Sequence, residues 1–101
     1  MLTSHRLLQQ YWHDDRYDRR EVRVWYTDRG APDDRSMASG TDISLEPYYL
    51  DIQTPAGTKP VPYHRILLIT YNGVVVFSNQ KIQGLEEIIV ARARDEDRTI
   101  L

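Results

Sequence analysis

Two short polar clusters contain residues that could bind a phosphate group. The first, Asp28-Arg29-Gly30, ends a stretch of alternating apolar and polar residues, and the second, Tyr63-His64-Arg65, precedes the apolar sequence ILLI. A guanidinium group donates two parallel hydrogen bonds to a phosphate, so Arg29 and Arg65 are candidate phosphate ligands. If the strands that carry the clusters pair in antiparallel fashion, the end of one lies beside the start of the other and the clusters meet.

Other residues in and beside these clusters suit RNA as the bearer of the phosphate. Trp25 or Tyr63 would give a nucleobase an aromatic face on which to stack. His64 would add a hydrogen-bond donor that titrates near neutral pH, and Asp28 would orient the histidine or an arginine. The same residue types also have structural explanations: a turn at Asp28, a structural histidine that shares a strand face with Ile66, and a core tryptophan.

Motifs of dedicated catalytic sites are missing from the sequence. It has no glycine-rich phosphate loop, no HExxH and no GxSxG, and its three histidines are spread along the chain. An enzyme remains an alternative, because His64 paired with Asp28 or Asp33 could cleave a phosphoester by acid–base catalysis without a metal. We predict no cofactor and no metal site, since carboxylates such as Asp34 have no diagnostic spacing for magnesium.

The first part of the chain predicts one helix and one strand that lead to the first cluster. Apolar residues recur at helical spacing over residues 3–12, behind Thr3 and Ser4, which can cap the helix. The charged run that follows predicts a solvated loop whose charges pair with one another. Residues 21–27 alternate between two faces and predict a strand. The strand ends where the loop of residues 28–34 begins, which contains glycine and proline.

The second part of the chain predicts antiparallel hairpins that lead to and from the second cluster. Residues 37–43 give a weak strand signal. Residues 48–53 alternate between the two faces of a predicted strand, and the TPAG that follows favours a turn into a further strand at Val61. Asn72-Gly73 between two β-branched runs is the favoured two-residue hairpin turn. Pro60 and Pro62 cannot donate to a ladder, so the strand that continues from them into ILLI must begin at an edge.

Length and composition predict a single α+β domain over residues 1–101. The chain has 101 residues, of which 41% are hydrophobic and 28% charged. One helix and about five short strands predict an N-terminal helix packed on a small curled antiparallel sheet or a partly open barrel. Residues 82–101 form a C-terminal extension, and the spacing of its apolar residues is compatible with either a helix or a strand.

Charge and cysteine content restrict the class of partner and the compartment. The chain has no cysteine, and its longest apolar stretch is shorter than the roughly 20 residues that span a bilayer, so we expect a cytoplasmic protein without a membrane segment. The net charge of −2 gives no overall attraction to RNA, so binding must depend on where the charges lie. A protein-interaction module, docked through VVVF and the acidic tail, is a further alternative.

The two polar clusters also carry a resemblance to a known family. VWYTDRGAPDD, then VPYHRILLI, then GVVVF resemble the archaeal family of small uncharacterised proteins known as the RNA cyclic-group-end recognition domain, over roughly residues 5–78. The family usually has a Trp-Asp pair near its start, and here one residue is inserted to give Trp12-His13-Asp14. Trp12 and Asp14 are therefore not carried over as site residues.

The resemblance implies a binding module for RNA ends, such as those with a 2′,3′-cyclic phosphate. Members occur alone or fused to RNA-processing enzymes, which implies an RNA-processing protein as a partner. Carried over to this sequence, the resemblance places five residues in the recognition site and gives Gly30 the role of setting the loop: Asp28, Arg29, Tyr63, His64 and Arg65. The expected function is recognition of a phosphate-bearing RNA end rather than catalysis.

Overall fold

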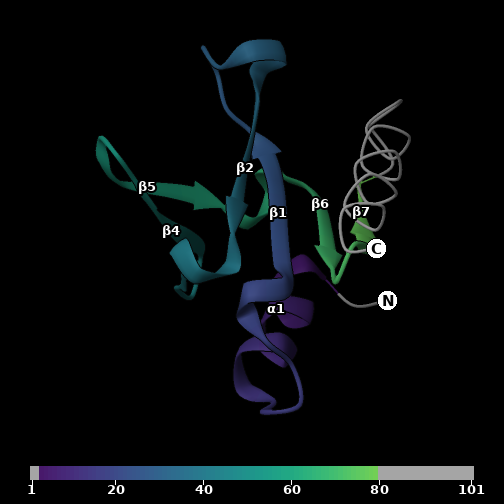
Figure 1. Ribbon diagram of the computed structural model, residues 1–101. Coiled ribbons are helices and arrows are strands. Elements are labelled where there is room, and N and C mark those ends of the chain that lie inside the picture. Colours follow the sequence, from purple (N-terminus) through teal and green to yellow (C-terminus); the bar gives the residue numbers. More distant parts are fainter. Residues whose placement is uncertain (1–2, 80–101) are drawn as a thin grey trace, which may run out of the picture.

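The computed structural model describes residues 3–79, which form one helix, seven strands and four short 3₁₀ turns (Figure 1). The helix is α1 (Ser4–His13) and the turns are η1 (Arg19–Glu21), η2 (Pro32–Asp34), η3 (Gly40–Asp42) and η4 (Tyr63–Arg65). The strands are β1 (Val22–Thr27), β2 (Arg35–Ser39), β3 (Ile43–Leu45), β4 (Tyr49–Thr54), β5 (Gly57–Pro62), β6 (Ile66–Tyr71) and β7 (Val74–Ser78). The extension predicted from Ile82 lies outside the described residues.

The helix α1 forms where helical spacing of apolar residues predicted it. The Thr3 hydroxyl accepts a hydrogen bond from the Arg6 backbone N–H at 3.2 Å and so caps an amide that has no partner within the helix. Leu7, Leu8 and Tyr11 are buried on one face. No helix among residues 3–79 is long and apolar enough to cross a membrane.

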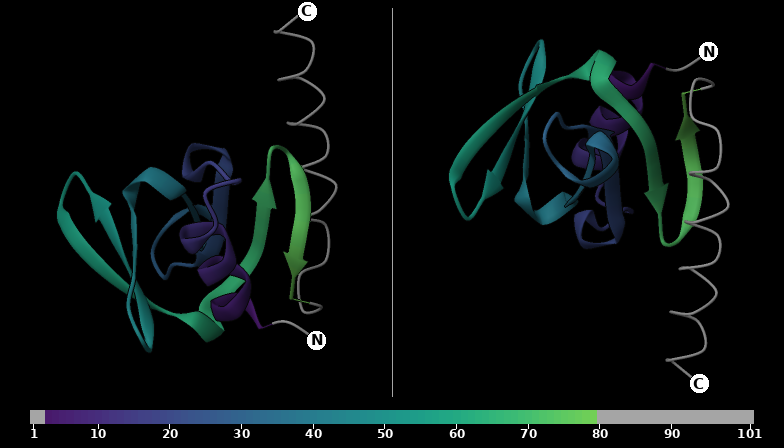
Figure 2. Two further views of the ribbon diagram at one scale, coloured as in Figure 1. Left: turned by 90° about the horizontal axis from the view of Figure 1, so that it is seen from below. Right: turned by 90° about the horizontal axis from the view of Figure 1, so that it is seen from above.

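The strands form two antiparallel sheets, of orders β2-β1-β6-β7 and β3-β4-β5. The predicted α+β class is confirmed, but residues 3–79 contain seven strands where about five were expected. The weak segment around residues 37–43 contributes to both β2 and β3, and the strand expected to run from Val61 into ILLI is divided into β5 and β6. Figure 2 shows α1 between the three-stranded sheet and the β6–β7 hairpin. Within the described part of the chain the two sheets do not close into a barrel, since each keeps its own pair of edge strands.

One hydrophobic core joins the helix to both sheets. Buried residues of β1 alternate with partly exposed ones, so that Val22, Val24 and Tyr26 face this core. The three-stranded sheet contributes Leu50 and Ile52 from the middle of β4, together with other buried residues. The core therefore fixes how the strands that carry the polar clusters sit relative to one another.

The two predicted hairpin turns are confirmed. The prediction that one strand continues from Pro60 and Pro62 into ILLI is wrong. Asn72 and Gly73 have φ values of 52° and 79°, as the turn between β6 and β7 requires. The prolines do lie in an edge strand, β5, but the turn η4 separates it from β6, which belongs to the other sheet. His64 is in this turn and shares no strand face with Ile66, because the chain must change direction between the sheets.

Candidate functional site

The two polar clusters are brought to one corner of the four-stranded sheet by the pairing of β1 with β6. The strands are antiparallel, and their register ends with Tyr26 opposite Ile66. Asp28 and Arg29 follow the end of β1, and Arg65 directly precedes the start of β6. The strand pairing on which the predicted site depends is therefore present, and we call this region the β1–β6 corner.

Asp28 is held at the corner by two residues from other strands. The Lys59 ammonium group of β5 forms an ion pair with Asp28 Oδ1, and the Ser36 hydroxyl of β2 donates a hydrogen bond to Asp28 Oδ2 at 2.6 Å. These bonds lower the pKa of Asp28, the one from Lys59 most. Within residues 3–79, Asp28 thus contacts neither His64 nor an arginine, and it links the two sheets through Lys59.

Lys59 was missing from the residues expected at this site. It lies between Thr58 and Pro60 in a polar stretch that gives no sign of a special role, and only the packing of the two sheets brings it to Asp28. Its Nζ atom also lies 5.9 Å from the centre of the Tyr26 ring, within the range of a cation–π contact. The pKa of Tyr26 is raised, first by burial and then by the charge of Asp28.

Arg29, His64 and Arg65 remain available to a ligand. All three are exposed, and within residues 3–79 none has a hydrogen-bond, ion-pair or ring-contact partner. Arg29 lies in the β1–β2 loop, which projects beyond the sheet (Figure 1) and is closed by a 2.8 Å bond from the Asp28 N–H to the Asp34 carbonyl. Gly30 of this loop has a φ of 91°, a conformation that glycine adopts without steric cost.

Tyr63 has its polar group and one ring face occupied by other parts of the protein. Its hydroxyl donates a hydrogen bond to the Glu46 backbone carbonyl, and its ring stacks on His5 of α1 with centroids 4.1 Å apart and planes 19° apart. Burial raises the pKa of Tyr63. The residue therefore anchors the turn η4, which carries His64 and Arg65, to α1 and to the β3–β4 connection.

Trp25 lies on the opposite face of the four-stranded sheet from Tyr26. Its neighbours in β1, Val24 and Tyr26, face the main core, whereas Trp25 packs in a second small cluster around the fully buried Leu68. Asp28 follows Tyr26 by two residues, and Lys59 lies over the Tyr26 ring. The structure therefore places Trp25 away from the Asp28–Lys59 contact.

A family model described as the MJ1316 RNA cyclic group end recognition domain matches residues 1–79. The chain belongs to this family. The match confirms the resemblance and covers all of the described residues, whereas residues 80–101 lie beyond it. No curated protein and no solved structure matches the chain significantly.

In this member of the RNA cyclic group end recognition family, the charged loop before β1 pairs with itself as predicted. Asp14 binds Arg16 and Asp18 binds Arg20, with closest N–O distances of 2.6 and 2.8 Å. The Arg16 side chain lowers the pKa of Asp14 to about 2. These charges neutralise one another and lie at the opposite end of β1 from the β1–β6 corner.

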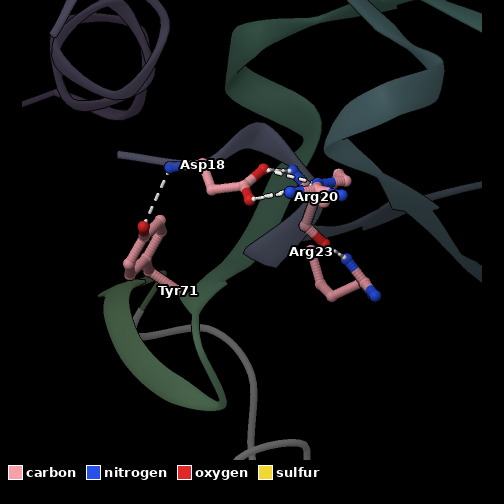
Figure 3. A network of polar contacts seen from close by, with 4 residues as sticks. All are labelled: Asp18, Arg20, Arg23 and Tyr71. Atoms are coloured by element: carbon pink, nitrogen blue, oxygen red, sulfur yellow. Dashed lines mark hydrogen bonds and ion pairs between the residues drawn. The ribbon is translucent and has the colours of Figure 1, made fainter. Parts of the chain in front are cut away.

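A network of polar contacts ties this loop to the four-stranded sheet. Figure 3 shows Asp18 between Tyr71 and Arg20, and its backbone N–H donates to the Tyr71 hydroxyl at 2.9 Å. Arg23 donates to the Arg20 carbonyl at 2.6 Å. The loop is therefore fixed, and with it Arg19, whose guanidinium carbon lies 5.8 Å from the centre of the Trp12 ring. Among residues 3–79 no group of three or more metal-ligating side chains is found.

The ion pair of Asp28 predicts a pH-dependent contribution to stability. Because the pKa of Asp28 is lowered in the folded protein, its contribution is present above the unfolded-state pKa of about 3.9 and is lost as the pH falls through the folded value. We expect Asp28→Asn to cost about 1 kcal/mol at neutral pH and much less at about pH 3, as measured by urea unfolding.

The matched control for this prediction is Asp42→Asn. Asp42 is exposed in the turn η3, and no partner is found for its carboxylate in the described part of the chain. Its replacement should leave the free energy of unfolding nearly unchanged at both pH values. An Asp28→Asn variant whose stability deficit stayed the same at both pH values would contradict the assignment of the effect to the carboxylate charge.

Proposed function

We propose that this protein binds a phosphate-bearing RNA end, such as a 2′,3′-cyclic phosphate, at the β1–β6 corner. Arg29 and Arg65 contact the phosphate, and His64 donates a further hydrogen bond to it. Membership of a family named for the recognition of RNA cyclic ends supports this proposal. The observation that carries it is the antiparallel pairing of β1 with β6, which places the two arginine-bearing segments at one corner.

The electrostatics of the corner suit an anion. The Asp28 carboxylate is already paired with Lys59 and bonded to Ser36, so it does not compete for the exposed arginines. A guanidinium group bonds a phosphate through two parallel donors and keeps its charge at all physiological pH values. The side chains that bring the positive charge are thus exposed, whereas the carboxylate that supports the corner is tied to the protein.

The roles of the remaining predicted residues follow from their contacts. Tyr63 holds the turn η4 in place through Glu46 and His5, and thereby positions His64 and Arg65. Gly30 sets the loop that carries Arg29. Trp25 packs in the cluster around Leu68, so it stabilises the sheet beneath the corner rather than stacking a base.

The test is the affinity for three short RNAs of one sequence that end in a cyclic phosphate, a 3′-phosphate or a 3′-hydroxyl. We expect the protein to prefer the phosphate-bearing ends, and Arg65→Ala to weaken their binding about tenfold or more, because a hydrogen-bonded charge is lost. The slope of log affinity against log salt should fall by about 1 in this variant. Fluorescence anisotropy at two salt concentrations measures both quantities.

The matched control is Arg16→Ala, which removes the same charge from the loop at the other end of β1. Arg16 is exposed and bonds Asp14, so its loss should leave the preference for phosphate ends intact. Equal binding of all three RNAs by the wild type would refute the proposal. Conversion of the cyclic end during the assay would show phosphoesterase activity, and its survival in His64→Ala would exclude His64 as the acid or base.

A further inference from the structure

An open groove runs between α1 and the connection from β3 to β4. It has a volume of about 590 Å³, which is within the size range of small-ligand sites. One wall is a single face of α1, since His5, Gln9, Trp12 and His13 are spaced by helical turns. The other wall is formed by residues 44–48, and Arg19 also lines the groove. The β1–β6 corner does not line this groove.

Aromatic rings line the groove, and among them Tyr48 is the most open to a ligand that stacks. Tyr48 has 84% of its surface exposed, more than any other large hydrophobic residue among residues 3–79, and nothing in the described structure bonds to it. Trp12 packs against the main core on one side and is covered by Arg19, and its buried Nε1 atom has no hydrogen-bond partner among residues 3–79. An exposed tyrosine beside a fixed indole and a histidine is typical of surfaces that stack nucleobases.

The polar groups of the groove suit the edges of a base better than they suit a phosphate. Gln9 offers an amide that both donates and accepts, Ser44 offers a hydroxyl, and Glu46 offers a carboxylate. Arg19 is the one arginine that lines the groove, and Glu46 offsets its charge. A ligand here would therefore be planar and aromatic, held by stacking and by hydrogen bonds at its edge.

The groove is connected to the β1–β6 corner through Tyr63. This residue precedes His64 in the turn η4, and its ring stacks on His5, which lines the groove. Its hydroxyl bonds the backbone carbonyl of Glu46 in the opposite wall. For an RNA whose terminal phosphate contacts His64 and Arg65, the groove is thus the adjoining surface, and the nucleotides before the phosphate end would lie on it.

We infer that the groove binds nucleobases of the single strand whose phosphate end occupies the β1–β6 corner, with Tyr48 stacking on one of them. This inference rests on the proposed function and extends it from the end group to the adjacent nucleotides. The corner recognises the phosphate, and the groove adds affinity that depends on bases rather than on charge. Because stacking accepts every base, the contribution is largely independent of sequence.

The test compares two RNAs of equal length that share the same phosphate end. One carries all its bases, and the other has abasic riboses at every position except the last, so that its charge is unchanged. We expect Tyr48→Ala to weaken binding of the first RNA about tenfold and to leave binding of the second unchanged. Arg65→Ala should weaken the binding of both RNAs.

The matched control is Tyr49→Ala, which removes the neighbouring tyrosine. Tyr49 is 37% exposed, begins β4 and does not line the groove, so its loss should not distinguish the two RNAs. Equal effects of Tyr48→Ala on both RNAs, or none on either, would overturn the groove inference while the end-binding proposal stands. A wild-type protein that binds neither RNA, or that ignores the phosphate end, would overturn both.

Discussion

Replacement of Gly40 by alanine is expected to lower the free energy of unfolding by about 3 kcal/mol. Gly40 is buried in the turn η3, and a Cβ atom built on it would overlap the Arg19 backbone carbonyl oxygen and lie 3.0 Å from Val22 Cβ. A backbone group cannot move aside as a flexible side chain does, so the turn η1 must shift as a whole. Thermal unfolding should show a midpoint lower by on the order of 10 °C or more.

The effect of Gly40→Ala should also reach the groove, because η1 carries the Arg19 that lies over Trp12. The matched control is Gly30→Ala, where the added Cβ meets nothing within 4 Å but φ is 91°. That variant tests backbone strain alone and should cost about 1 kcal/mol. A Gly40→Ala protein as stable as the wild type would contradict the close packing of η1 against η3.

Replacement of Ile66 by alanine is expected to destabilise the protein by about 3 kcal/mol, since it removes buried methylene and methyl groups and leaves a cavity. Ile66 is 1% exposed, begins β6 directly after Arg65 and pairs with Tyr26 of β1. The cavity would therefore lie beneath the β1–β6 corner. Chemical unfolding in urea, at a pH where Asp28 is ionised, measures the loss without interference from the ion pair.

The matched control for Ile66 is Ile66→Val, which deletes one methyl group and should cost about 1 kcal/mol. The graded loss from valine to alanine distinguishes a packing role from a general intolerance of substitution. If alanine cost no more than valine, the site would have collapsed around the smaller side chain, and Ile66 would not support the corner rigidly.

Local patterns in the sequence were sufficient for the elements whose structure depends on neighbouring residues. The helical spacing of Leu7, Leu8 and Tyr11 behind Thr3 predicted α1, and the alternation of residues 21–27 predicted β1. Asn72-Gly73 predicted the β6–β7 hairpin, because the φ values that its turn needs are favoured by these two residue types alone. The resemblance likewise depended on two short contiguous blocks, and the family match confirmed it.

Features that depend on distant parts of the chain could not be read in this way. Residues 61–69 look like one strand, since apolar and β-branched residues continue through them, yet η4 divides them between two sheets. Lys59 gives no local signal, and only sheet-to-sheet packing brings it to Asp28. Tyr48 and Trp12 are 36 positions apart in the sequence and share a groove only because α1 packs beside the β3–β4 connection.

The sequence by itself determined the residue types of the candidate site and the end of β1, which leads to Asp28 and Arg29, because strand and turn propensities are local. Only the tertiary structure decided which of those residues remain free for a ligand. Hydrogen bonds and packing between separate elements occupy Asp28, Tyr63 and Trp25 and leave Arg29, His64 and Arg65 exposed. Contacts of this kind arise from the packing of helix and sheets around a common core, which no short stretch of sequence encodes.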